Sequence, residues 1–190
     1  AGNCAGGTDP LFTVASSTTH HAVLTQVPGR PARTPTSAKG FDSPSTYTNL
    51  TNAINDNTGN WAVINTYDDT DDKIYIGDDN KFSRVVVNTN FVNNLVVTLA
   101  GEYYNGSTWV SLTNFVDNTS DVNSTVTLSD DGSILFDEPG NWAKTTIDGE
   151  NKFWIRLDPS GSLSENSVSI TEFEVTDRHS KDLLIVGGPD

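Results

Sequence analysis

The chain has 190 residues, a length suited to one compact domain with an appendage. Its 25 Asp and Glu residues outnumber its 11 Lys and Arg residues, and the formal net charge of -14 at pH 7 repels nucleic-acid phosphates and anionic lipids. We therefore expect neither nucleic acid nor a membrane as a partner. A lone cysteine, Cys4, cannot form an internal disulfide, so the fold must depend on packing.

The N-terminal segment, residues 1–45, differs from the rest of the chain in charge and in its turn residues. Residues 10–41 contain no Asp or Glu but include Arg30, Arg33 and Lys39. The prolines and glycines of the same stretch disrupt sheet ladders. We predict an extended arm that becomes ordered on a neighbouring subunit, with these three cations as its assembly residues. A disordered leader or linker is the alternative reading.

Residues 46–178 have the composition of an all-β domain. Short runs rich in Val, Ile, Thr and aromatic residues alternate with turns rich in Gly, Asn and Asp. The predicted strands are 61–64, 73–76, 82–89, 95–104, 108–112, 125–128, 134–136, 153–157 and 168–175, with one helical turn at 49–55. About nine strands at this spacing predict an antiparallel β-sandwich or jelly roll.

The strongest local signal is a β-hairpin around Asn105-Gly106. An Asn-Gly pair supplies the positive φ angles of a two-residue type I′ turn. Such a turn would place Glu102 opposite Trp109, whereas a three-residue loop would place Tyr103 there. In the first register, Glu102, Tyr104 and Trp109 share one face of the hairpin, and either face could be the core.

Two features mark the C-terminal end of the chain. The alternation of apolar residues changes parity between Ile170 and Phe173, which predicts a bulge or an edge strand. Residues 183–186, Leu-Leu-Ile-Val, are too apolar to remain in water. We therefore expect the tail, residues 179–190, to pair as a strand on its own sheet or on a neighbour's.

Several aromatic-rich motifs follow one another along the body. They are Asp72-Lys73-Ile74-Tyr75-Ile76-Gly77, Lys81-Phe82-Ser83-Arg84-Val85, the hairpin 102–112, Asp131-Gly132-Ser133-Ile134-Leu135-Phe136, Pro139-Gly140-Asn141-Trp142 and Phe153-Trp154-Ile155-Arg156-Leu157. In this order they resemble a β-sandwich module, similar to galactose-binding jelly rolls, of structural proteins from tailed bacteriophages and related viruses. The likeness covers residues 71–175, with Tyr103-Tyr104 and Phe153-Trp154 each in place of Tyr-Trp.

The resemblance implies a non-enzymatic structural protein located in the virion. A capsid decoration, a fibre or a tail appendage would assemble with copies of itself or with major capsid or tail proteins. A cationic arm beside an acidic body suits such assembly. The alternative function is a carbohydrate-binding module for host-surface glycans, with Trp61, Tyr104 and Trp109 as stacking residues. Filling of the sandwich core is the other role open to the tryptophans.

Catalysis and metal binding have less support in the sequence. None of the three histidines lies in a catalytic motif and no Gly-x-Ser-x-Gly elbow exists, so we predict no enzyme. A carboxylate pair for glycoside hydrolysis stays open. Asp68, Asp69, Asp71 and Asp72 offer oxygen ligands for Ca²⁺ without the spacing of an EF-hand, and a solvated loop is the alternative. We expect no other cofactor.

Overall fold

The computed structural model describes part of the chain and divides it into two compact units. The described residues are 31–42, 46–55, 71–163 and 168–176, together with three strands at 22–25, 62–63 and 183–186. One unit extends from Arg30 to Arg178, and the other combines the two chain ends, Ala1–Gly29 and His179–Asp190. The larger unit is called the body below, and the pair of chain ends is called the terminal unit.

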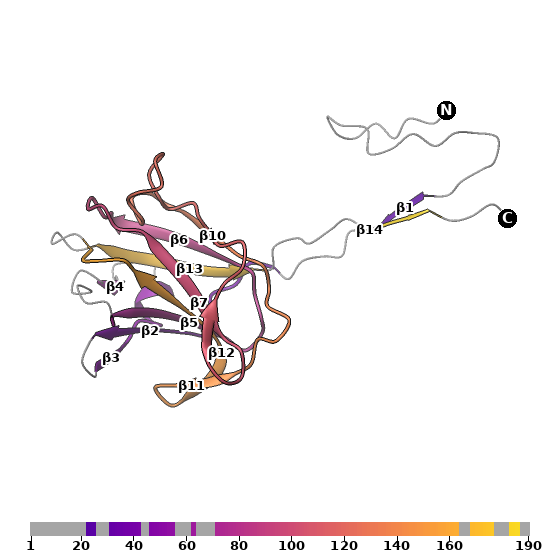
Figure 1. The fold of residues 1–190 in the computed structure, drawn as a ribbon, viewed down its shortest axis with the longest axis horizontal. Coiled ribbons are helices and arrows are strands. Elements are labelled where there is room, and N and C mark those ends of the chain that lie inside the picture. Colours follow the sequence, from indigo (N-terminus) through magenta and orange to yellow (C-terminus); the bar gives the residue numbers. More distant parts are fainter. Residues whose placement is uncertain are drawn as a thin grey trace. The chain divides into compact units, whose positions relative to one another are not determined.

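The body consists of two sheets and a short 3-10 helix, η1 (Ala53–Asn55) (Figure 1). The five-stranded sheet has the order β4 (Ala62–Val63), β13 (Ser169–Thr176), β6 (Arg84–Phe91), β10 (Gly132–Leu135), β9 (Val116–Asp117). The seven-stranded sheet has the order β3 (Thr46–Asn49), β2 (Ser37–Asp42), β5 (Lys73–Asp78), β12 (Glu150–Pro159), β7 (Leu99–Tyr104), β8 (Trp109–Ser111), with β11 (Thr145–Ile147) paired to β12. All pairings between the described strands are antiparallel, which confirms the predicted all-β fold, a β-sandwich.

The hydrophobic core fills the space between the two sheets. Alternate residues of the central strands point inward, since successive side chains of a strand face opposite sides. They include Ile74 and Ile76 of β5, Ile155 and Leu157 of β12, Val85 and Val87 of β6, and Phe173 and Val175 of β13. Trp142 closes the core with its ring centroid 5.1 Å from that of Phe82 and 6.2 Å from that of Phe136. Trp142 therefore has the core role that the sequence left open for the tryptophans.

The hairpin at Asn105 has a longer connection than either register expected. Tyr104 pairs with Trp109 and Glu102 with Ser111, so the predicted opposition of Glu102 to Trp109 is wrong by two residues. The connection spans residues 105–108, with a hydrogen bond of 3.0 Å from the Asn105 nitrogen to the Thr108 oxygen. Because the shift is even, the predicted sharing of a face by Glu102, Tyr104 and Trp109 holds.

The side chain of Asn105 explains the longer connection. Its Oδ1 accepts hydrogen bonds from the backbone nitrogens of Ser107, at 3.0 Å, and Thr108, at 2.9 Å. Asn therefore acts here as the acceptor of an Asx turn and does not take the positive φ of a type I′ turn. Gly106 alone has positive φ in this connection, at 102°.

A two-residue turn of the expected kind lies elsewhere, at Asp148-Gly149. Ile147 pairs with Glu150 across it, and the φ angles of Asp148 and Gly149 are 46° and 80°. Positive φ at both central positions defines a type I′ turn, and Asp-Gly is one of its preferred pairs. This Asp-Gly pair lies between β11 and β12, and we did not predict a turn there from the sequence.

Two further strand predictions meet different outcomes. The predicted bulge is confirmed, because the pairing of β13 with β6 shifts register on both sides of Ile170. The predicted strand at 125–128 is wrong. Asp121 holds this segment as a loop through hydrogen bonds from the backbone nitrogens of Thr125, at 2.7 Å, and Val126, at 2.9 Å. The Thr125 bond first, and then the Val126 bond, lower the pKa of Asp121, so the carboxylate form is the one that the loop stabilises.

The boundary of the N-terminal arm differs from the predicted position after residue 45. Ser37–Asp42 forms β2 inside the seven-stranded sheet, between β3 and β5. Arg33 is also part of the body, because its backbone exchanges hydrogen bonds of 3.0 and 2.7 Å with that of Val175. The prolines that indicated an extended arm precede this strand and do not interrupt it. Arg33 and Lys39 therefore belong to the sandwich, while Arg30 lies outside the described residues.

The terminal unit contains one two-stranded antiparallel sheet. β1 (Ala22–Thr25) pairs with β14 (Leu183–Val186), so that Val23 stands opposite Ile185. The apolar tail thus pairs with an apolar run of the N-terminal segment. No helix within the described ranges has the length and the hydropathy needed to cross a bilayer.

We predict that residues 30–178 fold without the terminal unit, whereas residues 42–178 do not. The shorter chain lacks most of β2, including the buried Ala38 and Lys39, and exposes the edge of β5. Thermal unfolding followed by circular dichroism should give the 30–178 chain the midpoint of the full protein. The 42–178 chain should lose more than about 10 °C or fail to fold. Equal midpoints for the two truncated chains would contradict the placement of β2.

Candidate functional site

The face of the seven-stranded sheet opposite the core carries aromatic and charged side chains. Alternation places these residues away from Ile74, Ile76, Ile155 and Leu157, which point into the core. We call this surface the aromatic face. It comprises Phe41, Tyr47, Tyr75, Tyr104, Trp109, Arg156 and Glu102.

Strand register sets three residues of this face and the neighbouring Lys39 in one row across the sheet. Lys39 pairs with Tyr75, Tyr75 with Arg156, and Arg156 with Glu102. Cross-strand neighbours on one face lie close enough to interact. The Nε of Arg156 accordingly donates to Oε2 of Glu102 at 2.6 Å. A tyrosine and an ion pair thus stand side by side in the middle of the sheet.

Trp109 lies across this row. Its ring centroid is 5.8 Å from that of Tyr75, although β8 and β5 are separated by β7 and β12. Three strand spacings amount to about 14 Å, so the indole must extend over the intervening strands. The guanidinium of Arg156 lies 4.7 Å from the indole centroid, which is within cation–π range. Trp109 therefore covers the Arg156–Glu102 pair and remains half-buried.

The lysines of this sheet face are paired with carboxylates. Nζ of Lys39 lies 2.7 Å from Oε1 of Glu150 and 3.2 Å from Oδ2 of Asp148. Burial alone would lower the pKa of Lys39, but the hydrogen bonds to Glu150 and Asp148 outweigh burial and raise the pKa. Lys73 pairs with Asp158 at 2.9 Å. The positive charge of each of these two lysines is therefore compensated locally.

The β11–β12 hairpin covers one end of the face. Trp154 has no exposed surface, although it lies on the side of β12 opposite the core. Its indole nitrogen donates to the backbone oxygens of Thr145, at 3.1 Å, and Glu150, at 3.2 Å. Below the ring, a Cβ on Gly77 would lie 2.5 Å from the indole, so only glycine fits there. Trp154 is consequently part of the structure of the face and is not available to a ligand.

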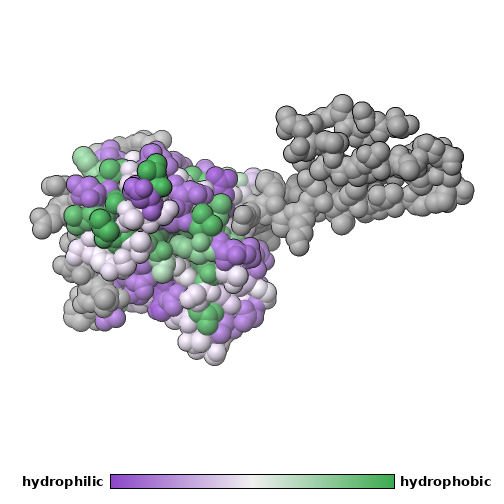
Figure 2. All heavy atoms as spheres, turned by 45° about the horizontal axis from the view of Figure 1, so that its top comes forward, coloured by the Kyte–Doolittle hydropathy of each residue, from purple (hydrophilic) through white to green (hydrophobic). Residues whose placement is uncertain are grey.

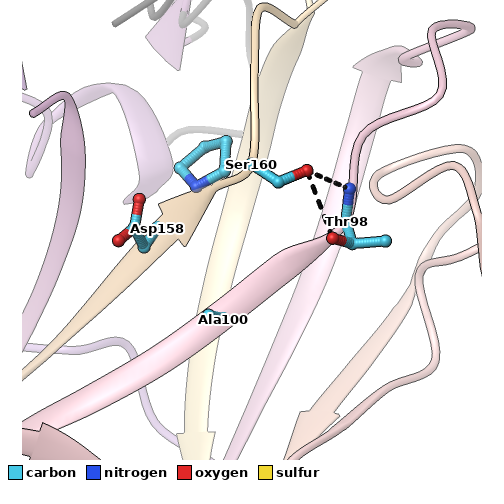
Figure 3. Close-up of a pocket in the computed structure, with 5 residues that line it drawn as sticks. Thr98, Ala100, Asp158 and Ser160 are labelled. Atoms are coloured by element: carbon cyan, nitrogen blue, oxygen red, sulfur yellow. Dashed lines mark hydrogen bonds between the residues drawn. The ribbon is translucent and has the colours of Figure 1, made fainter. Parts of the chain in front are cut away.

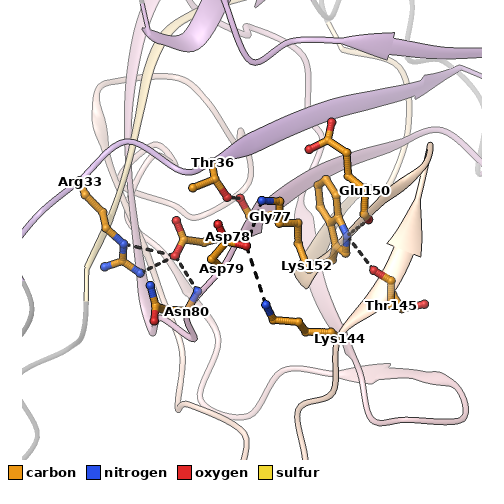
Figure 4. A network of polar contacts seen from close by, with 11 residues as sticks. Arg33, Thr36, Gly77, Asp78, Asp79, Asn80, Lys144, Thr145, Glu150 and Lys152 are labelled. Atoms are coloured by element: carbon orange, nitrogen blue, oxygen red, sulfur yellow. Dashed lines mark hydrogen bonds and ion pairs between the residues drawn. The ribbon is translucent and has the colours of Figure 1, made fainter.

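Acidic residues at the end of β5 are engaged by cations (Figure 4). Asp78 Oδ1 accepts from Nη2 of Arg33 at 2.8 Å and from the nitrogen of Asn80 at 2.9 Å. Asp79 accepts from Nζ of Lys152 at 3.0 Å, and this bond chiefly lowers the pKa of Asp79. Arg33, predicted to reach a neighbouring subunit, thus binds within its own chain.

An open hollow of about 250 Å³ lies on the same side of the sheet, between the start of β7 and the end of β12 (Figure 3). Thr98, Ala100, Asp158, Pro159 and Ser160 line it. Ser160 Oγ accepts a hydrogen bond from the nitrogen of Thr98 at 3.0 Å, and Asp158 forms an ion pair with Lys73. The volume falls below the roughly 300 Å³ at which pockets begin to enclose a small-molecule ligand. The hollow is an extension of the face and not a separate site.

Apolar residues also emerge on the other sheet and its loops. Figure 2 shows hydrophobic residues in several groups separated by hydrophilic ones. Phe91 at the end of β6 is 49% exposed, and Val122 in a loop is 99% exposed. Val92, Leu95 and Val96 are exposed as well, so the exposed apolar residues are partly grouped at the end of β6 and in the loop that follows it.

The predicted site residues have different fates. Tyr104 and Trp109 come together, with ring centroids 5.8 Å apart. Trp61, Asp68 and Asp69 lie outside the described residues. Of the other acids proposed for Ca²⁺, Asp71 is exposed and Asp72 is buried, and no group of three metal-ligating side chains occurs within the described ranges.

Sequence reasoning missed Tyr75, Arg156 and Glu102. All three lie in strand motifs that were recognised, at positions of the same parity as Trp109 or Tyr104 once the strands are paired. Pairing of the strands was the missing information. These residues could have been recognised in the sequence as charged or aromatic residues at every second position of a strand whose other positions are aliphatic.

Comparisons with protein families, with curated proteins and with solved structures found no match for this chain. The geometry of the aromatic face and the pairing of the chain ends therefore carry the functional argument.

We predict that Gly77→Ala destabilises the protein by about 1–3 kcal/mol, because the new methyl group collides with the Trp154 ring. Gly161→Ala is the matched control, since a Cβ there meets no atom within 4 Å. The control should change the free energy of unfolding by less than about 0.5 kcal/mol. Chemical denaturation followed by tryptophan fluorescence measures both. Equal stability of the two variants would show that the indole does not rest on Gly77.

We also predict a loss of stability at high pH that depends on Tyr75. Burial, followed by the nearby Tyr47, raises the pKa of the Tyr75 hydroxyl. The folded state thus favours the neutral form, and this contribution is complete below the ordinary pKa of about 10 and is lost as pH rises through the raised value. Denaturation from pH 9 upward should show a steeper loss for the wild type than for Tyr75→Phe. Parallel curves would contradict the prediction.

Proposed function

We propose that this chain is a non-enzymatic structural protein of a virus particle, attached to the particle or to other copies through its paired chain ends. The observation that carries the proposal is the pairing of β1 with β14, two short strands from opposite ends of the sequence. The resemblance of the motifs in residues 71–175 to modules of phage structural proteins supports the virion as the setting.

The paired positions of the two chain ends are equally spaced along the sequence. In the body, the backbone of Arg33 pairs with that of Val175. Seven residues separate Thr25 from Arg33, and seven separate Val175 from Leu183, and Thr25 pairs with Leu183 in the terminal unit. Both ends can therefore act together as one attachment segment, in place of the single N-terminal arm expected from the sequence.

The two-stranded sheet of β1 and β14 needs a further strand or surface to be stable. Two-stranded sheets are marginally stable in water when they stand alone, and these strands have only four residues each. Seven of the eight residues are apolar, and each strand has a second edge that accepts another strand. Addition of strands from another copy or from a shell protein would stabilise the pair and attach the body.

Glycan binding by the aromatic face is the second candidate function. The observation that favours it is the clustering of the half-buried Tyr104 and Trp109 with the Arg156–Glu102 ion pair on a sheet surface. Aromatic rings pack against the apolar faces of sugars, and fixed polar groups bind their hydroxyls. A virion protein that contacts host-surface glycans would use both functions.

We predict that Val23→Asp in the full chain abolishes self-association or incorporation into particles while the body stays folded. The new carboxylate would stand opposite Ile185 in the β1–β14 pair and oppose burial of that pair. Val122→Asp is the matched control, because Val122 is 99% exposed on the body. Sedimentation velocity measures self-association, and co-purification measures incorporation. Normal assembly of Val23→Asp would overturn attachment through the chain ends.

A further inference from the structure

We propose that the aromatic face selects neutral glycans and excludes acidic ones. This inference rests on glycan binding as the second proposed function and names the class of sugar that the face accepts. It follows from the pairing of charges on the face, from the spacing of the rings and from the exposure of each ring.

The pairing of charges argues for a neutral ligand. Arg156 is bound by Glu102, Lys39 by Glu150 and Asp148, and Lys73 by Asp158. A carboxylated sugar would need one of these cations, and its binding would leave the displaced protein carboxylate without a partner. The formal net charge of -14 adds a general repulsion of anions. A neutral sugar avoids both costs, since its hydroxyls can donate to Glu102 and accept from Arg156 without breaking their ion pair.

The spacing of the rings argues for a ligand longer than one sugar. Ring centroids follow one another at 6.0 Å from Tyr47 to Tyr75, 5.8 Å from Tyr75 to Trp109 and 5.8 Å from Trp109 to Tyr104. These residues belong to strands from β3 to β8, which span about 24 Å of sheet. Tyr75 is only 5% exposed and packs against Trp109, so the rings open to a ligand are Tyr47 on one side and Trp109 with Tyr104 on the other. Open rings at two separate places fit an oligosaccharide that reaches across both.

The exposure of the rings argues against a protein partner on this face. Among the described residues of this face, Tyr47 is 36% exposed and Trp109 and Tyr104 are half-buried, so none of these rings projects fully enough to fill a partner's pocket. Stable protein interfaces depend on such buried aromatic or arginine anchors and bury about 800 Å² on each side. The edges of these rings lie level with the ion pairs of the face. Such a surface suits a ligand in which every unit has both CH groups and hydroxyls, as a sugar does.

The test is calorimetric titration of the full chain with two sets of probes. The neutral probes are hexasaccharides of glucose, galactose, mannose and N-acetylglucosamine, and the acidic probes are sialyllactose and oligogalacturonate. We expect saturable binding of at least one neutral probe and no binding of either acidic probe. Trp109→Ala and Tyr47→Ala should each weaken neutral binding about tenfold. Phe91→Ala, an exposed aromatic change on β6 of the other sheet, should leave it unchanged.

The variant Glu102→Gln tests whether charge pairing, and not the shape of the face, excludes acidic sugars. This substitution keeps the size of the side chain but leaves the Arg156 charge without its carboxylate, so sialyllactose or oligogalacturonate should now bind. Tyr47 lies on the edge strand β3, which keeps the ring test valid if Trp109→Ala fails to fold.

Each adverse outcome has a distinct meaning. Acidic probes that bind the wild type as tightly as neutral ones would overturn the selectivity and leave glycan binding in place. An unchanged affinity in both ring variants would overturn the aromatic face as the site. Failure of every probe would overturn the selectivity and the second proposed function together, while attachment through the chain ends would be unaffected.

Discussion

The central strand β5 is buried on both faces, and the rest of the body follows from this constraint. All six of its residues are buried. Ile74 and Ile76 pack into the core between the sheets, as expected for a sandwich. The opposite face has no third sheet in the described structure, so side chains of neighbouring strands must exclude the water. Trp109 reaches over the sheet from β8, and the β11–β12 hairpin covers Trp154 beside β5.

Burial of this second face determines where the charges lie. The side chains of Lys39 and Lys73 are 4% and 9% exposed, so each needs a carboxylate at contact distance to remain charged. The partners come from distant parts of the chain, Glu150 and Asp158, whose side chains are 35% and 34% exposed. Ion pairs that stabilise the sheet thereby compensate the cations on this side of the sheet, and the proposed selectivity for neutral ligands would have the same cause.

The alternation of apolar and polar residues predicted the class of fold and which side chains share a face of each strand. It could not predict which strands pair with each other. Tyr104 and Trp109 were correctly set on one face because parity survives a shift of two residues. The register itself depends on how Asn105 uses its side chain, a choice that Asn-Gly composition leaves open. Tyr75 and Arg156 meet across β5 and β12, about eighty positions apart in the sequence, so no local pattern connects them. Strand β2 was missed because the prolines before it suggested an extended arm.

The proposed attachment and the proposed ligand binding would use different residues, so one chain could perform both. The attachment proposal depends on β1 and β14 in the terminal unit, whereas the rings and ion pairs of the aromatic face all belong to the body. Arg33 joins the body at the point where the chain ends depart, since it pairs with Val175 through the backbone and with Asp78 through its side chain. Because Asp78 ends β5 and Tyr75 lies within it, strain on the chain ends would be borne by the strand that organises the face. Asp78 is 1% exposed and Arg33 is 24% exposed, so loss of Arg33 would leave a buried carboxylate at the end of β5.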